Sequence, residues 1–429
     1  MIGADKIIEK KKEYLFPSSW GNHFYKNPPE IVRGHMQYLY DNTGKRYVDF
    51  FAGVSVMNCG HCNEEILDVT IKQMQTLQHT TIIYLTEQMV NLAERLSNIL
   101  PGDLKRVFFC CTGSEANEGA MLLARLHTGK NEFIALENGL HGRTYLTMSA
   151  TAIPMWRADP DLLPKIHFAK NTYSLNKNLE ESARESLNDI EKIINLRGAE
   201  NIAALIVEPI QGNGGIITPP LWYFKELKKL LELNNILLIV DEVQTGFART
   251  GKMFAIENYD VVPDIMTVAK ALGNGMPISA FCANDKVAKS FVKPSASTLG
   301  GNPVSSATAM AVLDYIEKND LCNSAAKLGR VLKCGLEKLQ TKFSIIKDIR
   351  GLGLMVGAEL QLKTGEPATE ITDIILEKLK DRGFIVGKNG LNRNVLAFQP
   401  PLVITEENIN ELLINFEEVL KEVSVNDID

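Results

Sequence analysis

The sequence predicts an α/β fold, in which helices cover both faces of a mainly parallel sheet and a smaller α+β unit follows. Between about Asn58 and Pro303, short apolar runs (RVFFCC, EFIALE, AALIVEP, ILLIVDE, DIMTVAK and ISAFCA) alternate with segments of helical periodicity, the pattern of strands joined by crossover helices. The run from Ile236 to Val240 contains only β-branched residues and leucine, as in a strand covered on both faces. A chain of 429 residues with 45% hydrophobic content can form a large core and a second domain.

The elements outside this region predict the second domain. Residues 36–51, MQYLYDNTGKRYVDFF, form two alternating runs joined by Asp-Asn-Thr-Gly, which indicates a hairpin. A long amphipathic helix is expected after Asn302-Pro303, and KDIRGLGLMVGAEL, GFIVGK and NVLAFQPPLVI supply further strands. The N-terminal hairpin is expected to join these strands. We therefore predict an N-terminal segment of the small domain at 1–57, a large domain at 58–305 and the rest of the small domain at 306–429.

Composition excludes several classes of protein. A net charge of −6 offers no basic surface for nucleic acid. The N-terminal MIGADKIIEKKKEYLF interleaves charges with its few apolar residues, so we expect no signal peptide, no membrane span and a cytoplasmic location. Seven cysteines in so long a chain indicate reduced thiols.

The cysteine pair Cys59-Gly60-His61-Cys62 has the spacing of a redox motif. A redox pair needs its first cysteine at a helix N-terminus of a small thioredoxin-like unit, and this segment has no such context. We therefore predict neither redox nor metal function there. Cys110 and Cys111 end an apolar run, and core packing is the expectation for both.

An acid and a lysine follow two successive apolar runs. Asp241 comes directly after ILLIV, and Lys270 ends DIMTVAK. A carboxylate at a strand end can pair with the protonated pyridine nitrogen of pyridoxal phosphate and keep the ring an electron sink, while a lysine nearby can form the Schiff base. These two residues are therefore the candidate catalytic pair.

The segments DEVQTGFARTG and VAKALGNGMPISA resemble the class III (subgroup II, fold-type I) pyridoxal-phosphate-dependent aminotransferases, which include the ornithine, acetylornithine, 4-aminobutyrate and other ω-amino enzymes. The resemblance runs from about Arg33 to the PPLVIT segment near residue 404. It implies the fold-type I transferase architecture, with a sheet of the seven-stranded type in the large domain. It also implies pyridoxal 5′-phosphate as cofactor and no metal.

The resemblance implies a role for several further residues. In the strand, turn and helix of RVFFCCTGSEANEG, Gly113 and Ser114 would hold the phosphate at a helix N-terminus, where free N–H groups and the helix dipole favour anions; an ordinary N-cap there is compatible with this role. Val243 would pack on one ring face and Gln244 would bond the ring oxygen O3′. The remaining cofactor residues implied are Leu140, His141 and Glu208.

Thr298, in STLGGNPVSS, matches the threonine that reaches the phosphate of the partner subunit. The resemblance therefore implies a homodimer, or a dimer of dimers, because each site would be incomplete in a monomer. A plain loop hydroxyl in a glycine-rich turn is the alternative.

The chain departs from the family pattern at two positions. Leu140 stands where the family has an aromatic residue that stacks on the cofactor, so stacking should be weaker and the site roomier. Arg143 is retained and matches a carboxylate clamp. Ala397 stands where acetylornithine-type members have the arginine for the α-carboxylate of glutamate, although Arg143, Lys388 or Arg393 could substitute.

Three aromatic residues match positions that line the substrate pocket: Phe24, Tyr25 and Tyr84. Exposed aromatics near a dimer interface are the alternative.

The expected activity is transfer of an amino group from an ω- or β-amino substrate to an oxo acid such as 2-oxoglutarate or pyruvate. Because Ala397 removes one clamp, the candidates are β-amino acids, taurine-like amines and β-aminoacyl thioesters such as 3-aminobutyryl-CoA. The main alternative is a pyridoxal-phosphate-dependent lyase that acts on an amino-phosphate or amino-phosphonate compound. A cofactor-binding protein without catalysis is disfavoured by the presence of Lys270, Asp241 and Gln244.

Overall fold

A computed structural model describes residues 3–20 and 24–426, and its strands form two sheets of seven strands each. The large sheet has the order β4-β10-β9-β8-β7-β5-β6. Only β10 runs antiparallel to its neighbours, so this sheet is mainly parallel, as predicted. Its strands are β4 (Arg106–Cys110), β5 (Glu132–Leu136), β6 (Ile166–Ala169), β7 (Ile202–Val207), β8 (Leu237–Asp241), β9 (Ile265–Val268) and β10 (Ser279–Ala283).

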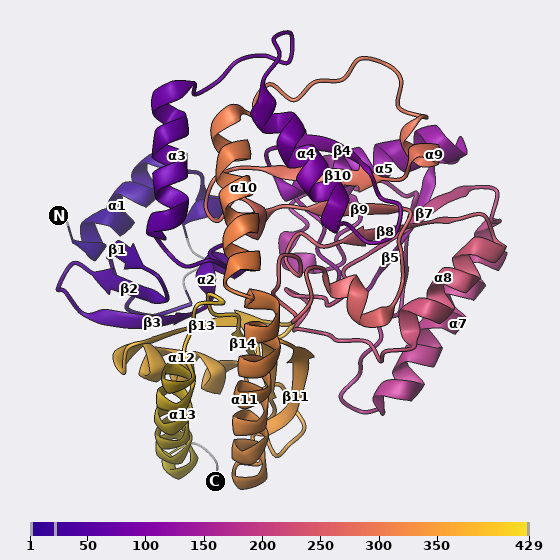
Figure 1. The fold of residues 1–429 in the computed structure, drawn as a ribbon. Coiled ribbons are helices and arrows are strands. Elements are labelled where there is room, and N and C mark those ends of the chain that lie inside the picture. Colours follow the sequence, from indigo (N-terminus) through magenta and orange to yellow (C-terminus); the bar gives the residue numbers. More distant parts are fainter. Residues whose placement is uncertain (1–2, 21–23, 427–429) are drawn as a thin grey trace.

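The second sheet joins the two ends of the chain, with the order β1-β2-β3-β13-β14-β12-β11 (Figure 1). The predicted hairpin is formed by β2 and β3, with Tyr38 opposite Val48. It reaches the C-terminal strands because β3 pairs in parallel with β13, so the N-terminal hairpin does join the later strands. The strands are β1 (Ile31–His35), β2 (Tyr38–Asp41), β3 (Arg46–Phe50), β11 (Ile346–Leu352), β12 (Met355–Leu360), β13 (Phe384–Asn389) and β14 (Val395–Phe398).

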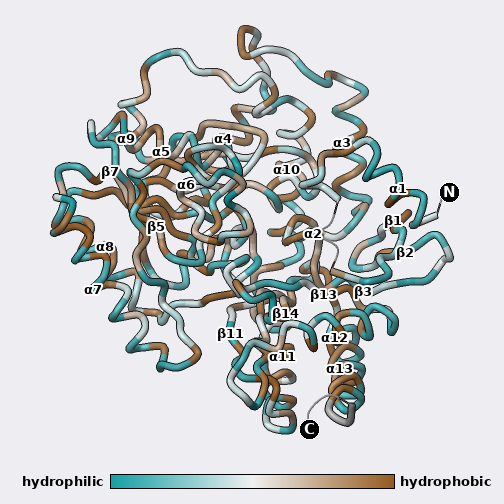
Figure 2. Tube along the Cα trace, turned by 180° about the vertical axis from the view of Figure 1, so that it is seen from behind, coloured by the Kyte–Doolittle hydropathy of each residue, from teal (hydrophilic) through white to brown (hydrophobic). Residues whose placement is uncertain are grey.

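Alternate residues of the central strands face two different sets of helices. Leu238 and Val240 belong to the hydrophobic cluster that contains Tyr223 and Phe224 of α8. Ile239 belongs to the cluster that contains residues of α5. Because side chains of a strand alternate between faces, the unbroken apolar run at 236–240 is explained by cover on both faces (Figure 2).

The helices follow the sequence signals at their ends. Asn302 caps α10, which begins at Pro303, and the Asn302 side chain accepts a bond from Ser305 N, as predicted for this Asn-Pro pair. The helices of the large-sheet region are α3 (Glu64–Thr76), α4 (Glu87–Ile99), α5 (Gly113–Thr128), α6 (Tyr145–Ser149), α7 (Leu179–Arg197), α8 (Tyr223–Leu233), α9 (Asp285–Ala288) and α10 (Pro303–Lys318). The others are α1 (Ala4–Tyr14), α2 (Ala52–Ser55), α11 (Leu321–Lys342), α12 (Thr369–Asp381) and α13 (Glu406–Asn426).

The domain boundaries at 57/58 and 305/306 stay predictions. Residues 1–2, 21–23 and 427–429 of the predicted spans lie outside the described residues. Among the helices of residues 3–20 and 24–426, none has both the length and the apolar character needed to cross a membrane.

Candidate active site

Two cavities meet at the carboxyl ends of the parallel strands, where α/β sheets bind ligands. The smaller cavity, of about 340 Å³, is lined by Asp241 at the end of β8 and by Lys270, two residues after β9. The larger cavity, of about 630 Å³, is lined mainly by aromatic and aliphatic side chains. Both cavities share Ser114, Leu140, Gly142, Gln244 and Lys270, so a ligand in the larger cavity would reach the Lys270 amine.

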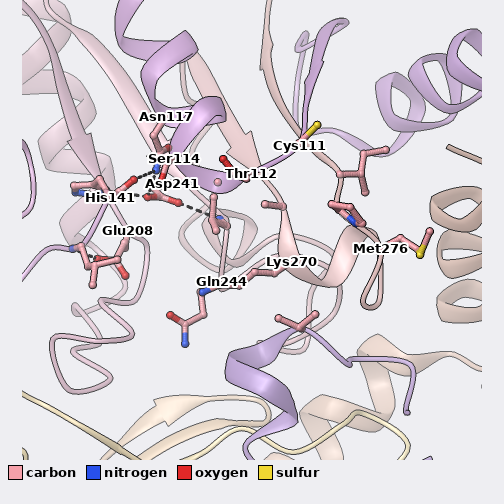
Figure 3. Close-up of a pocket in the computed structure, with 18 of the residues that line it drawn as sticks. Cys111, Thr112, Ser114, Asn117, His141, Glu208, Asp241, Gln244, Lys270 and Met276 are labelled. Atoms are coloured by element: carbon pink, nitrogen blue, oxygen red, sulfur yellow. Dashed lines mark hydrogen bonds and ion pairs between the residues drawn. The ribbon is translucent and has the colours of Figure 1, made fainter. Parts of the chain in front are cut away.

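Asp241 is buried and is held by three N–H donors. Asn117 Nδ2 and His141 Nδ1 lie 2.7 and 2.8 Å from its Oδ2 atom (Figure 3). The backbone N–H of Val243 donates to its Oδ1 atom at 3.1 Å. The orientation of the Asn117 amide is set by the Thr267 hydroxyl, which donates to Asn117 Oδ1 at 2.7 Å. These donors compensate the burial of the carboxylate.

Lys270 lies across the cavity from this network (Figure 3). Its backbone is left-handed, with φ +46°, a conformation that L-residues adopt rarely outside special sites. Burial lowers the pKa of Lys270, although the charges of Asp241 and Glu208 oppose this shift. The neutral amine is therefore favoured at lower pH than for an exposed lysine, and only the neutral amine is a nucleophile or a base.

The N-terminus of α5 opens into the smaller cavity. Thr112 and Glu115 form a capping box, which leaves the N–H groups of Gly113 and Ser114 without an intrahelical acceptor. The Ser114 hydroxyl accepts a bond from Arg143 N at 3.1 Å, so its own hydrogen is available to an anion. Glycine is required at 113 because a Cβ atom there would lie 2.8 Å from Val243 Cγ1.

Leu140, Val243 and Gln244 complete the walls of the smaller cavity. Gln244 Nε2 donates to Gln399 Oε1 at 3.3 Å. Gly212 makes room for Gln244, since a Cβ atom at 212 would lie 2.3 Å from Gln244 Oε1. Together with the Asp241 carboxylate, the Lys270 amine and the helix N-terminus, these groups fit pyridoxal phosphate, which presents a pyridine nitrogen, a carbonyl and a phosphate.

Glu208 follows β7 and lines the same cavity. Its two carboxylate oxygens accept bonds from Leu140 N at 2.9 Å and Gly212 N at 3.0 Å. Burial, together with the Asp241 charge, raises the pKa of Glu208 to about 7, and these two backbone bonds and the nearby His141 oppose the shift.

Phe24 and Tyr25 line the larger cavity; their contact with substrate, which the resemblance implies, stays a prediction. The Tyr25 hydroxyl donates to Val386 O at 3.2 Å. Phe51 and Val54 extend this wall from a left-handed turn in which residues 52–55 all have positive φ. For Val54, with φ +68°, this conformation is strained because its side chain is β-branched.

Two arginines line the larger cavity, Arg143 and Arg393. Arg143 is exposed. The Arg393 guanidinium lies 5.1 Å from the centroid of the Phe24 ring, and burial lowers the pKa of Arg393. Neither guanidinium makes a salt bridge within the described residues. Lys388, in contrast, pairs with Asp373 and lines neither cavity.

Three predicted site residues are not brought to either cavity. Ala397 is fully buried in β14 and packs in a cluster with Ile210, Ile216 and Met355. Thr298 is exposed in a loop, and Tyr84 is 66% exposed in another. The Thr298 and Tyr84 roles would require a partner subunit, and all three roles stay predictions.

The cysteines differ in their surroundings. Cys59 is buried and Cys62 is exposed, and both are free thiols; burial raises the pKa of Cys59. Cys110 is buried in β4, as predicted. Cys111 lines the smaller cavity instead of the core, because it is the first residue after the strand and precedes the helix cap at Thr112.

Sequence reasoning did not single out Asn117, Trp156, Asn213 or Asn389. Of these four residues, only Asn117 could have been recognised from the sequence. It is a polar residue on the face of α5 that carries the buried residues Ala116, Ala120 and Met121. A buried amide needs partners, so its neighbourhood had to be polar.

The family described as aminotransferase class-III matches residues 22–420. Alanine–glyoxylate aminotransferase 2 homolog 2, mitochondrial, of Arabidopsis thaliana is 40% identical over 415 residues, which cover 96% of this chain and 86% of that protein. Acetylornithine aminotransferase of Caldanaerobacter subterraneus subsp. tengcongensis is 38% identical over 426 residues, which cover 97% of this chain and 100% of that protein.

Among solved structures, a transaminase from the marine bacterium Virgibacillus has a TM-score of 0.91 and 29% identity, with 98% of this chain and 99% of that chain covered. The sequence matches span almost the whole chain, and the fold agrees with them. The protein therefore belongs to the class III aminotransferase family and is a pyridoxal-phosphate-dependent aminotransferase.

Proposed function

We propose that the enzyme transfers an amino group from an ω- or β-amino substrate to an oxo acid such as 2-oxoglutarate or pyruvate, and that both substrates bind in the larger cavity. The observation that carries this proposal is the shared wall of the two cavities. Lys270, Ser114 and Gln244 border both, so an amine in the larger cavity can reach the lysine that would carry the cofactor.

The residues of the smaller cavity would hold the cofactor, which supplies an electron sink when it is bound. Asp241 would pair with its ring nitrogen, with His141 and Asn117 fixing that carboxylate. Gly113 and Ser114 would bind the phosphate, and Leu140 and Val243 would face the two sides of the ring. Gln244 would bond the ring oxygen, and Glu208 would face Lys270 from the end of β7.

Lys270 would move the proton in the transfer. Its amine lies at the boundary of the two cavities, and its lowered pKa favours the neutral form that can accept a proton from the substrate carbon. Efficient proton transfer requires a group whose pKa lies near the working pH, and burial moves Lys270 in that direction.

The two cavity arginines would bind carboxylates of the substrates. Arg143 and Arg393 offer planar forks suited to bidentate contacts. Arg393 comes from the segment before β14, so it can supply the second clamp that Ala397 does not. An oxo acid with two carboxylates, such as 2-oxoglutarate, would use both.

The donor would combine an amine with a largely apolar body. Phe24, Phe51, Met155 and Trp156 line the larger cavity together with the two arginines, and such a surface favours β-amino acids and carboxylate-masked amines, including β-aminoacyl thioesters such as 3-aminobutyryl-CoA. Ornithine and N-acetylornithine would place polar groups against this wall at a desolvation cost.

We further propose a homodimer in which Thr298 completes the partner's phosphate site. The loops that carry Tyr84 and Thr298 border a common apolar cavity of about 330 Å³, which contains Ile82 and Ser297. Ile83 and Leu85 are 81% and 101% exposed beside it. Exposed apolar patches of this kind mark interaction surfaces, and a second copy of the chain is the proposed occupant. The cytoplasmic location stays a prediction.

A half-reaction screen tests the proposed function. The purified enzyme in its pyridoxal phosphate form is mixed with β-amino acids, ω-amino acids and amine-bearing thioesters, and absorbance reports whether the pyridoxamine form accumulates. Transamination predicts accumulation that a later oxo acid reverses. A lyase would release ammonia or phosphate without accumulation, and that result would refute the proposal. Lys270→Ala is the control and should be inactive with every amine.

A further inference from the structure

The loop after β7 forms a closed turn that reaches from the large sheet to the second sheet. Gln211 and Ile217 pair through two backbone bonds, of 3.0 and 3.1 Å. Gly215 N and Ile216 N both donate to Gly212 O within the turn. We call residues 211–217 the bridging loop.

Three residues in or next to the second sheet hold the bridging loop through four hydrogen bonds. Arg350 of β11 donates Nε and Nη2 to Gly215 O at 2.9 and 2.6 Å. Asn389 Nδ2 donates to Gly212 O at 2.9 Å, and Gly390 N donates to Asn213 O at 3.0 Å. Arg350 makes two of the four contacts. Glycine is favoured at 215 because its φ is +116° and because a Cβ atom there would lie 3.1 Å from Arg350 Nη2.

The charge of Arg350 is already balanced within the second sheet. Its Nη1 atom lies 2.8 Å from Asp348 Oδ2 and 2.7 Å from Glu359 Oε2. Its guanidinium lies 4.1 Å from the centroid of the Tyr173 ring, and the Tyr173 hydroxyl donates to Glu359 Oε2 at 3.1 Å. The buried, planar guanidinium is thus fixed on two sides, so its remaining N–H groups point in a defined direction.

The bridging loop in turn forms part of the larger cavity. Trp156 Nε1 donates to Asn213 Oδ1 at 3.0 Å, and both side chains line that cavity. Gly212 N also donates to Glu208 Oε2 at 3.0 Å. A shift of Gly215 would therefore move the wall made by Asn213 and Trp156.

We propose that Arg350 is a positioning residue for substrate binding: through Gly215 O it fixes the bridging loop, and thereby the Asn213–Trp156 wall. This inference rests on the proposed use of the larger cavity as the substrate site. Arg350 itself does not line either cavity, so its effect on substrate must pass through the loop.

The test compares Arg350→Lys, Trp156→Phe and the double variant as holoenzymes. Lysine keeps the charge for Asp348 and Glu359 but cannot direct two N–H groups at Gly215 O. We expect Arg350→Lys to raise the KM of the amine about tenfold, the order expected for losing a hydrogen bond to a charged group, with little change in kcat or cofactor occupancy. Trp156→Phe should raise the KM similarly, and the double variant should be no worse than either single variant, because both changes release the same wall.

Trp156 fluorescence gives a readout that does not depend on turnover. The Trp156 signal is the difference between each protein and its Trp156→Phe counterpart, and it should change in Arg350→Lys. Arg382→Lys is the matched control, because Arg382 bonds Glu422 and Lys378 O in the same part of the fold without contacting the bridging loop. This control should leave both the KM and the Trp156 signal unchanged.

Each outcome decides the inference. If Arg350→Lys lowered the melting temperature but left the KM and the Trp156 signal unchanged, Arg350 would only support the structure and the proposal would be overturned. Additive effects of the two substitutions on the KM in the double variant would also overturn it. If no amine converts the wild-type cofactor, the proposed function fails, and the fluorescence arm alone still decides whether Arg350 sets the loop.

Discussion

Asn117 donates its side-chain N–H to Asp241 Oδ2 at 2.7 Å, although the two residues are 124 positions apart in the chain. The same oxygen lies 2.8 Å from His141 Nδ1. One carboxylate oxygen of Asp241 is thus saturated by donors from two other segments, and Oδ1 contacts the nearer backbone of Val243. This arrangement fixes the direction in which the carboxylate faces the cavity.

Replacing Asn117 should slow the amine half-reaction. Asn117→Leu keeps the branching of the side chain but removes one hydrogen bond to a charged group, a loss of about 1.5–3 kcal/mol, and we expect roughly a 10–100-fold lower rate. Thr267→Val, which removes only the hydroxyl that orients the Asn117 amide, should cause a smaller decrease. Stopped-flow absorbance of the cofactor measures both, and a wild-type rate in Asn117→Leu would contradict the role.

Glu208 should make stability depend on pH. Burial raises the pKa of Glu208 from 4.5 to about 7, so the folded chain binds this proton more tightly than the unfolded chain does. The resulting stabilisation is complete below pH 4.5 and is lost as pH rises to about 7, a change on the order of 3 kcal/mol. In Glu208→Gln this loss should be absent.

Urea unfolding of the cofactor-free protein at pH 5 and pH 8 measures this effect. Burial also raises the pKa of Glu242 to about 7. Glu242 therefore adds a similar pH dependence to the free energy of unfolding of both proteins, and this contribution cancels when the two are compared. If the free energies of unfolding of wild type and Glu208→Gln changed equally between the two pH values, the pKa of Glu208 would be the same in the folded and the unfolded chain, and the prediction would be wrong.

Substitution of the two cavity arginines should slow the two half-reactions unequally if the amine donor carries no free carboxylate. Arg143→Lys replaces a bidentate fork with a point charge, so it should impair the oxo-acid half-reaction more than the amine half-reaction. Arg393→Lys is the parallel variant at the other arginine of the cavity and tests the second clamp. An equal loss in the amine step would mean that the donor places its own carboxylate on Arg143.

Thr298 should contribute to cofactor affinity only in the dimer. Thr298→Ala is expected to weaken pyridoxal phosphate binding by about 1.5–3 kcal/mol, the value of one hydrogen bond to a charged group. Cofactor titration followed by fluorescence measures this, and sedimentation reports the oligomeric state. Ser295→Ala, in the same exposed loop and on the proposed interface cavity, is the matched variant: it removes a hydroxyl from that surface without removing the proposed phosphate contact, so cofactor affinity should not change. A fully active monomer in which Thr298→Ala is silent would exclude the role across subunits.

The left-handed backbone at Val54 should lower the stability of the folded protein. Both Val54→Gly and Val54→Ala remove the side chain from the cavity wall, but only glycine relieves the φ of +68°. The left-handed conformation costs an L-residue about 1–2 kcal/mol, and glycine loses part of this gain through its unfolded-state entropy. We expect Val54→Gly to be more stable than Val54→Ala by about 1 kcal/mol in thermal unfolding. The reverse order would mean that the turn relaxes without cost.

Local patterns in the sequence were sufficient to locate the main elements of the fold and to predict its α/β class. The apolar run that ends at Asp241 and the run before Lys270 are strands of one mainly parallel sheet. The Asp-Asn-Thr-Gly hairpin and the Asn302-Pro303 helix start are also confirmed. Such signals depend on neighbours a few residues away, through hydrogen bonding, capping and periodicity, and they can be read without knowing the packing.

The walls of the site could not be read in the same way. By sequence position, Ala397 is where a clamp is missing, yet its methyl group packs against Ile216 and Met355, while Arg393 lines the cavity. Likewise, the motif around Gly113 and Ser114 gave no reason to connect Asn117 with Asp241.

By itself, the sequence determined where the main strands and helices lie along the chain, the family and the residues that match its motifs. Only the tertiary structure decided which side chains meet: Asn117 with Asp241, Arg350 with the Gly215 carbonyl, and Trp156 with Asn213. The physical reason is that these contacts join segments of different sheets and helices, so they depend on how whole elements pack. A short window of sequence carries the propensity of an element but not the position of its neighbours.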